Sequence, residues 1–274
     1  MPRQASFTPI IREYTRRLVT IVQATRDAIA PLMAEIPALV SSASQHRQLV
    51  THDVVYFRRY DAGESGRVKA LLKRAKESLA VMTQPTQLER IAEEFARRTS
   101  EHSKAQLKKQ TIAALGVDVL PNDSLIASHM QDFVASNVSL ITSIPDKMLG
   151  QVEQVVYSGL RSGKTAAMLA DDIDAEFATG SKRAAVIARD QIGSFYGQLN
   201  AERQQSIGVK RFIWRTVHDD RVRDEHAERE KASDPKQGGE PYSYEDPPDG
   251  ELPGEPINCR CHAEPVFSDI LDAV

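Results

Sequence analysis

The chain has 274 residues, of which 41% are hydrophobic and 27% charged, a composition typical of a folded globular protein and not of a disordered one. No apolar run approaches the roughly 20 residues that a membrane-spanning helix requires, so we expect no membrane segment. The charged residues Arg12 and Glu13 interrupt the N-terminal stretch before the apolar core of a signal peptide could form. We therefore expect the protein to be made and kept in a cytosol.

The net charge of −3 is unevenly distributed along the chain. Residues 1–120 contain 19 Lys and Arg against 12 Asp and Glu, a balance of +7, whereas residues 121–274 contain 16 against 26, a balance of −10. This asymmetry predicts different neighbours for the two halves. The basic half is a candidate for non-specific contact with DNA or with an acidic protein surface. An ordinary solvated helical surface fits equally well, because the basic residues are scattered among acids.

The first 120 residues are predicted to be helical almost throughout, because apolar residues recur every three or four positions. Four stretches follow this pattern: 8–30, 33–50, 68–79 and 85–115. Between the second and the third, Val54–Phe57 predicts a short extended segment, and Gly63 and Gly66 predict a loop behind it. No known motif accounts for this half, which we interpret as a helical arm or domain.

The segment Leu120–Ser124 interrupts the helical pattern with a proline and three residues that can cap a helix. We therefore place a domain boundary there, between a helical domain of residues 1–120 and a second domain of residues 121–274. Beyond it, three breaks predict four successive helices: Pro145 starts the second, a turn at Gly159–Gly163 precedes the third, and Gly180 caps the fourth, over 182–205.

The chain changes character after Gly208. Phe212, Trp214 and Thr216 alternate with their neighbours, which predicts a strand over 211–217 with Trp214 in the core. Residues 232–257 are rich in Pro, Gly and acids and predict a long loop, after which Cys261–Phe267 is expected to pair with the first strand. The predicted fold class is mainly α with a small β element (α+β), in which helices lead into a compact C-terminal module.

The segment Gly159–Thr165 superficially resembles a phosphate-binding loop. Such a loop needs four residues between its glycines and a strand before it. Here three residues separate Gly159 from Gly163, and the preceding residues are helical, so we interpret the segment as a joint between two helices.

A dense set of polar residues follows the first predicted strand, and two cysteines stand where the long loop returns. The set contains His218, Asp219, Asp220, Arg221, Arg223, His226, Asn258, Cys259, Arg260, Cys261 and His262. If the two segments meet in space, His226, Cys259 and Cys261 come together. Thiolate and imidazole groups are zinc ligands, and a metal stabilises a loop that is too polar to fold through its own hydrophobicity. The sequence therefore predicts a candidate structural zinc site.

Two alternatives stay open for these residues. In the first, the cysteines are a reduced pair packed under the loop, and Asp219 or Asp220 binds Arg221, Arg223 or Arg260. A disulfide between cysteines one residue apart would close a small, strained ring. In the second, the cluster is catalytic, with a Cys–His nucleophile or an Asp-Asp-His metal site. No recognisable motif surrounds such a nucleophile.

The order Trp-x-Thr, Asp-x-Arg-Val-Arg-x-x-His, Pro-Pro and Asn-Cys-Arg-Cys resembles the signature of the phage Mu F-like minor head proteins. It is carried here within 211–267 by Trp214, Thr216, Asp219, Asp220, Arg221, Arg223, His226, Pro247, Pro248, Asn258, Cys259, Arg260 and Cys261. The upstream helices also resemble the family, so the resemblance covers about 121–267. One departure is the absence of a glycine turn soon after His226: the next glycines are Gly238 and Gly239.

The resemblance implies a role in assembly. Such proteins are minor capsid components at the portal vertex of the phage head, present in the virion and in the host cytoplasm during assembly. They act in head morphogenesis and in genome packaging or delivery, and no catalytic residue is implied. The expected partners are the portal protein and/or the major capsid protein. The alternative is a metal-dependent hydrolase or an injected effector enzyme that uses His226, Cys259 and Cys261.

Overall fold

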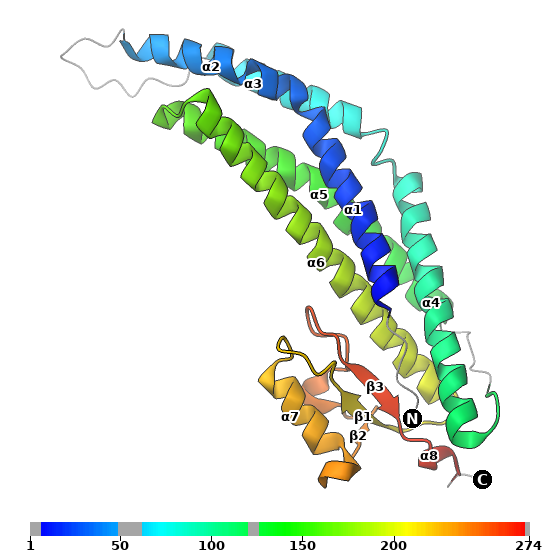
Figure 1. Ribbon diagram of the computed structural model, residues 1–274. Helices are drawn as coiled ribbons and strands as arrows, with labels where there is room; N and C mark the ends of the chain where they lie inside the picture. Colours follow the sequence, from blue (N-terminus) through cyan, green and yellow to red (C-terminus); the bar gives the residue numbers. More distant parts are fainter. Residues whose placement is uncertain (1–6, 49–61, 120–125, 272–274) are drawn as a thin grey trace. The chain divides into compact units, whose positions relative to one another are not determined.

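The computed structural model describes residues 7–48, 62–119 and 126–271 and is mainly helical, with one small antiparallel sheet (Figure 1). The predicted fold class is therefore confirmed. Six helices make up most of it: α1 (Thr8–Ala28), α2 (Ala30–Gln48), α3 (Ala62–Leu79), α4 (Pro85–Leu115), α5 (Ile126–Ser162) and α6 (Ala166–Ser206). Within the described ranges, no helix combines the length and the apolar character needed to cross a membrane.

The chain forms two compact units, each assembled from separated segments. The first combines 1–14, 89–137 and 186–274, and the second combines 15–88 and 138–185. The predicted boundary at Leu120–Ser124 lies outside the described residues, and the division into domains 1–120 and 121–274 remains a prediction. Each unit contains segments from before and from after that boundary. Four helices, α1, α4, α5 and α6, are each divided between the two units.

The predictions for the first half agree with α1 to α4, with one correction. Gly63 and Gly66 do not form a loop, because α3 begins at Ala62 and includes both glycines. Apolar side chains farther along the helix, Val68 and Leu72 among them, are buried and stabilise it. Their burial outweighs the roughly 1 kcal/mol that a glycine costs inside a helix. The predicted extended segment Val54–Phe57 lies outside the described residues.

Two of the three predicted breaks in the next segment are also corrected. α5 continues through Pro145, although a proline inside a helix costs about 3 kcal/mol, because Ile141, Ile144 and Met148 are buried on either side of it. α6 likewise continues through Gly180. The absence of a side chain there lets α6 approach Met148, whose Cε would lie 2.9 Å from an added Cβ.

The predicted joint between two helices is present but shorter than expected. Gly159 lies inside α5, and the turn is made by Gly163, whose positive φ of 78° suits a residue without a side chain. The Lys164 backbone N–H donates to the Gly159 carbonyl at 2.9 Å, and the Lys164 ammonium pairs with Asp172 at 2.6 Å. These bonds end one helix and place the start of the next, so the segment is no phosphate loop.

The C-terminal module contains β1 (Arg211–Arg215), α7 (Asp224–Ser233), β2 (Tyr242–Ser243), β3 (His262–Pro265) and α8 (Ser268–Leu271). The sheet has the order β2-β1-β3, with both pairs antiparallel, so the predicted pairing of the two longer strands is confirmed and a third strand is added. Trp214 lies opposite Ala263 and is completely buried, as predicted. Helix α7 was not predicted, and it supplies part of the candidate site.

The loop that carries the cysteines packs against α6 at two glycines. An added Cβ on Gly197 would lie 2.6 Å from the Pro253 carbonyl oxygen, and one on Gly193 would lie 3.3 Å from the Cys259 carbonyl oxygen. Gly254 faces them with a positive φ of 103°. The backbones of α6 and the loop are therefore so close at Gly197 that a side chain there would displace one of them. This contact sets the distance between the loop and α6.

We predict that Gly197→Ala lowers the free energy of unfolding by about 1–2 kcal/mol, because the new methyl group displaces the loop backbone. The matched control is Gly150→Ala in α5, where an added Cβ meets nothing within 4 Å. That change should raise stability by up to about 1 kcal/mol through helix propensity. Chemical denaturation of both variants tests this, and equal stabilisation by both substitutions would contradict the close packing at Gly197.

Candidate metal centre

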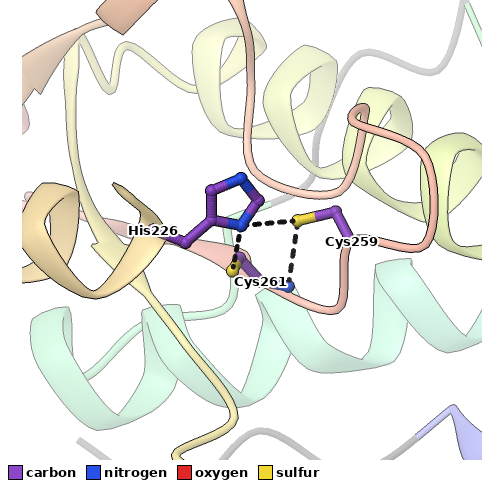
Figure 2. Close-up of side chains that lie close together, drawn as sticks. All are labelled: His226, Cys259 and Cys261. Atoms are coloured by element: carbon purple, nitrogen blue, oxygen red, sulfur yellow. Dashed lines mark hydrogen bonds between the residues drawn. The ribbon is translucent and has the colours of Figure 1, made fainter. Parts of the chain in front are cut away.

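His226, Cys259 and Cys261 converge beneath the C-terminal loop (Figure 2). The His226 Nδ1 atom lies 3.6 Å from the Cys259 Sγ atom and 3.4 Å from the Cys261 Sγ atom. All three ligand atoms lie within 4.8 Å of one another, and each residue is at most 5% exposed. The structure thus brings together the three residues that the sequence singled out, although they are 33 and 35 positions apart.

The two cysteines are separated by one residue in the segment that leads directly into β3. Asn258, just before them, has a positive φ of 60°, and its N–H donates to the Asp190 carboxylate at 2.9 Å. The Cys259 N–H donates to the Pro256 carbonyl at 2.8 Å. The Cys261 N–H points at the Cys259 Sγ atom at 3.4 Å. The backbone itself therefore holds both sulfurs in place.

The imidazole is held in the first turn of α7. Its ring meets Trp214 edge-on, with the centroids 5.2 Å apart. Burial, followed by the charges of Arg223 and Arg229, lowers the pKa of His226 below its ordinary value. The ring is therefore neutral at neutral pH, which is the form that binds metals. The Nε2 atom is buried and lies 3.5 Å from a carboxylate oxygen of Glu225.

The two thiols titrate as a pair. A hydrogen bond from Cys261, supported by the backbone N–H groups of Cys261 and Gly254, lowers the pKa of Cys259 to about 6. The same hydrogen bond and burial beside that thiolate raise the pKa of Cys261. One thiolate is therefore favoured at neutral pH, and the chemistry of the pair is that of a soft anionic ligand.

The turn after β1 is held by a buried carboxylate. Glu230 on α7 accepts a hydrogen bond from the Thr216 hydroxyl at 2.6 Å and another from the Thr216 N–H at 3.3 Å. It also contacts the His218 Nε2 atom at 2.9 Å, and His218 has a positive φ of 54°. Arg215 lies 3.6 Å away and pairs more closely with Asp234. Glu230 therefore determines where the polar segment leaves the sheet.

A second set of bonds joins this segment to the returning loop. Asp219 accepts two hydrogen bonds from the Arg260 guanidinium, each at 2.5 Å, and this pairing holds the pKa of Asp219 well below its usual range. The Arg223 guanidinium donates to the Ile257 carbonyl at 2.5 Å. The two segments that the sequence hypothesis required to meet are thus directly bonded.

Not every residue of the predicted cluster lies beside the three side chains of the candidate metal site. In the described part of the chain, the group of potential ligands is limited to His226, Cys259 and Cys261. His218 faces Glu230, and Asp219 faces Arg260. Asp220 and Arg221 are exposed at the surface of the turn. His262, on β3, is surrounded by Arg215, Glu230 and His218, and desolvation lowers its pKa to about 4.

Sequence reasoning missed two residues of α7. One is Glu230; the other is Arg229, whose guanidinium lies 4.8 Å from the Trp214 ring centroid and donates to Asp249 at 2.6 Å and to Glu251 at 3.1 Å. Arg229 therefore covers the core tryptophan and holds the loop that follows Pro248. A signal was available in the spacing of Glu230 from His226, four residues apart on one helix face, but only once the helix itself is assigned.

The fold and site define a helical protein with a small α+β module in which polar signature residues bind one another around a Cys–Cys–His cluster. Residues 150–264 match the family model described as phage Mu protein F like protein. This region of the chain belongs to the phage Mu F-like family, the phage head morphogenesis proteins that the sequence resembled.

A protein of Haemophilus influenzae (strain ATCC 51907 / DSM 11121 / KW20 / Rd), named only as an uncharacterized protein, is 31% identical over 205 residues. The match covers 73% of this chain but 44% of that relative, so the chain spans less than half of the relative's length. No solved structure matches the chain.

We predict that Glu230→Ala lowers the free energy of unfolding by about 3 kcal/mol, because it leaves the buried N–H and hydroxyl of Thr216 without their acceptor. The matched control is Glu228→Ala, an exposed residue of the same helix, which should change stability by less than about 0.5 kcal/mol. Denaturant unfolding measures both. Equal effects of the two substitutions would show that Glu230 does not hold the turn.

Proposed function

We propose that the protein is a minor capsid protein of a tailed bacteriophage that associates with the portal vertex and acts in head morphogenesis. The observation that carries this proposal is the family match over 150–264. The partners that we propose are the portal protein and/or the major capsid protein, and the place of action is the phage head. A contribution to genome packaging or delivery belongs to the same proposal.

The chemistry of the signature residues supports a structural role. Asp219 is bonded to Arg260, Thr216 to Glu230, and Arg229 to Glu251. These residues use their hydrogen-bonding groups to hold the module together. A hydrolase or an injected effector would need the Cys–Cys–His cluster to be open to a substrate, and all three residues are buried. Burial of this kind favours the assembly component over the enzyme.

We predict that the protein is incorporated into procapsids or mature heads in few copies, detectable by mass spectrometry of purified particles. A phage that carries Glu230→Ala should incorporate less of it, because the C-terminal module is destabilised. A phage that carries Glu228→Ala should incorporate the wild-type amount. Absence of the wild-type protein from both kinds of particle would contradict the proposal.

A second candidate function is contact with the packaged DNA through the basic N-terminal half. Helix α3 favours it, because four basic residues lie exposed on it within eight positions: Lys69, Lys73, Arg74 and Lys76. Some of this charge is compensated, since Lys76 pairs with Asp146 at 2.8 Å and Lys73 lies 3.8 Å from Glu77. Contact of this kind is directed at phosphates and reads no base sequence.

We predict that the full chain binds duplex DNA with an affinity that falls steeply between 50 and 200 mM salt, because phosphate contacts release counterions; the slope of log K against log salt should be roughly −0.9 per phosphate contact. The double variant Lys69→Glu/Arg74→Glu should weaken binding and reduce the salt slope by about 1–2. The control Lys182→Glu/Arg183→Glu, at exposed positions of α6, should leave both unchanged. Binding that is independent of salt, or equally affected by both double variants, would contradict this candidate.

A further inference from the structure

We propose that His226, Cys259 and Cys261 bind one zinc ion with a structural role, through the Nδ1 atom and the two Sγ atoms, and that a water molecule completes the four ligands. The ion would join the first turn of α7 to the loop that returns to β3. This inference is independent of the proposed function, because it concerns how the module is held together and not what the module binds.

The distances between the ligand atoms fit this ion. Zinc binds nitrogen at about 2.0–2.1 Å and thiolate sulfur at about 2.3 Å in tetrahedral sites, which puts a nitrogen and a sulfur ligand roughly 3.5 Å apart. The His226 Nδ1 atom lies 3.6 Å and 3.4 Å from the two sulfurs. In Figure 2 both sulfurs face the same ring nitrogen from different sides. These two distances match two edges of a tetrahedral zinc site, and the two sulfurs lie within 4.8 Å of each other.

The hydrogen bonds of the cluster are incomplete without an ion. A neutral ring nitrogen has one lone pair, yet the Nδ1 atom lies 3.6 Å from the Cys259 sulfur and 3.4 Å from the Cys261 sulfur, so at most one of these contacts is a hydrogen bond from a thiol to the ring. The Nε2 atom is buried without a hydrogen-bond partner of good geometry, and its nearest charged neighbour is the Glu225 carboxylate at 3.5 Å. That carboxylate favours the tautomer with the proton on Nε2, which turns the Nδ1 lone pair toward the sulfurs.

Metal-bound histidines usually donate from their second nitrogen to a carboxylate, and Glu225 is the carboxylate beside Nε2 here, at 3.5 Å. The sulfurs have matching neighbours, since the Cys261 N–H points at the Cys259 Sγ atom. Two soft sulfur ligands and an imidazole select zinc over magnesium or calcium, which prefer oxygen. Three protein ligands are one fewer than a closed structural zinc site has, which is why a water is needed as the fourth. Because all three side chains are buried beneath the loop, we assign the ion a structural role.

The test is the zinc content of the full chain, purified under reducing conditions without chelator and measured by inductively coupled plasma mass spectrometry. We expect about one zinc per chain in the wild type and a loss of at least about tenfold in Cys261→Ser and His226→Gln. The matched control His129→Gln removes a histidine on α5 that contacts Glu202, at 3.9 Å, and should keep the metal. Cobalt substituted for zinc should show thiolate charge-transfer absorption in the wild type and in this control only.

If the variants that lack a ligand do not fold, a milder substitution tests the site. Glu225→Gln, in the second layer around the metal, should fold normally and weaken zinc binding by about tenfold in competition with a chromogenic chelator. Its control, Glu228→Gln, should bind like the wild type. Equal affinities for the two variants would overturn the Nδ1 ligation.

Three results would overturn the zinc site as a whole. The first is a folded wild-type chain that takes up no zinc even when equimolar zinc is added. The second is an intact mass lower by two hydrogens after purification, because that chain contains a disulfide between Cys259 and Cys261. The third is unchanged zinc content in Cys261→Ser, which would assign the metal to another part of the chain.

Discussion

The C-terminal module depends on the contact between the polar segment after β1 and the loop that returns to β3. Its strands have five, two and four residues, which is too short for a sheet to be stable without further contacts. The sheet gains them from both ends of the long loop. The pairing of Asp219 with Arg260 and the bond from Arg223 to the Ile257 carbonyl join the two segments directly. The Cys–Cys–His cluster lies where these bonds converge.

The module is rich in polar residues because side-chain ion pairs and hydrogen bonds hold its segments together. Arg215 is only 16% exposed in its side chain and is surrounded by the carboxylates of Glu230, Asp234 and Glu264. A buried charge is costly unless it is paired and hydrogen-bonded, so these residues stabilise the module only as a complete set. A sequence that is dense in charges at this point therefore encodes a particular arrangement of loops and not a solvated surface.

Hydrophobic periodicity was a good guide wherever burial is apolar. It predicted helices at the positions of α1, α2 and α4, and the pairing of β1 with β3. It gave wrong ends where a Pro or Gly lies inside a helix, as at Pro145 and Gly180, because packing on both sides outweighs the local preference for a break. The physical reason lies in tertiary contacts, such as Met148 against Gly180, that a single sequence does not reveal.

Helix α7 escaped prediction for a different reason. Its buried face consists of His226, Glu230 and Ser233, at intervals of four and three residues, so the helical period is present but carried by polar side chains. A search for periodically spaced apolar residues therefore does not find this helix. The convergence of the two cysteines with His226 was nevertheless predictable, because it required only that the two ends of the loop meet. Glu230 and Arg229 were not, because their roles depend on the helix.

The second half of α6 belongs with the C-terminal module, and the family region includes it. The match begins at residue 150, well before β1. Gly193 and Gly197 let the loop backbone approach α6, and Asp190 accepts from the Asn258 N–H. Gln204 then donates to the Ala263 carbonyl of β3 at 3.3 Å. Since both the loop and the sheet are bonded to this part of the helix, the module has no complete core without it, and the second half of α6 and the module form one physical unit.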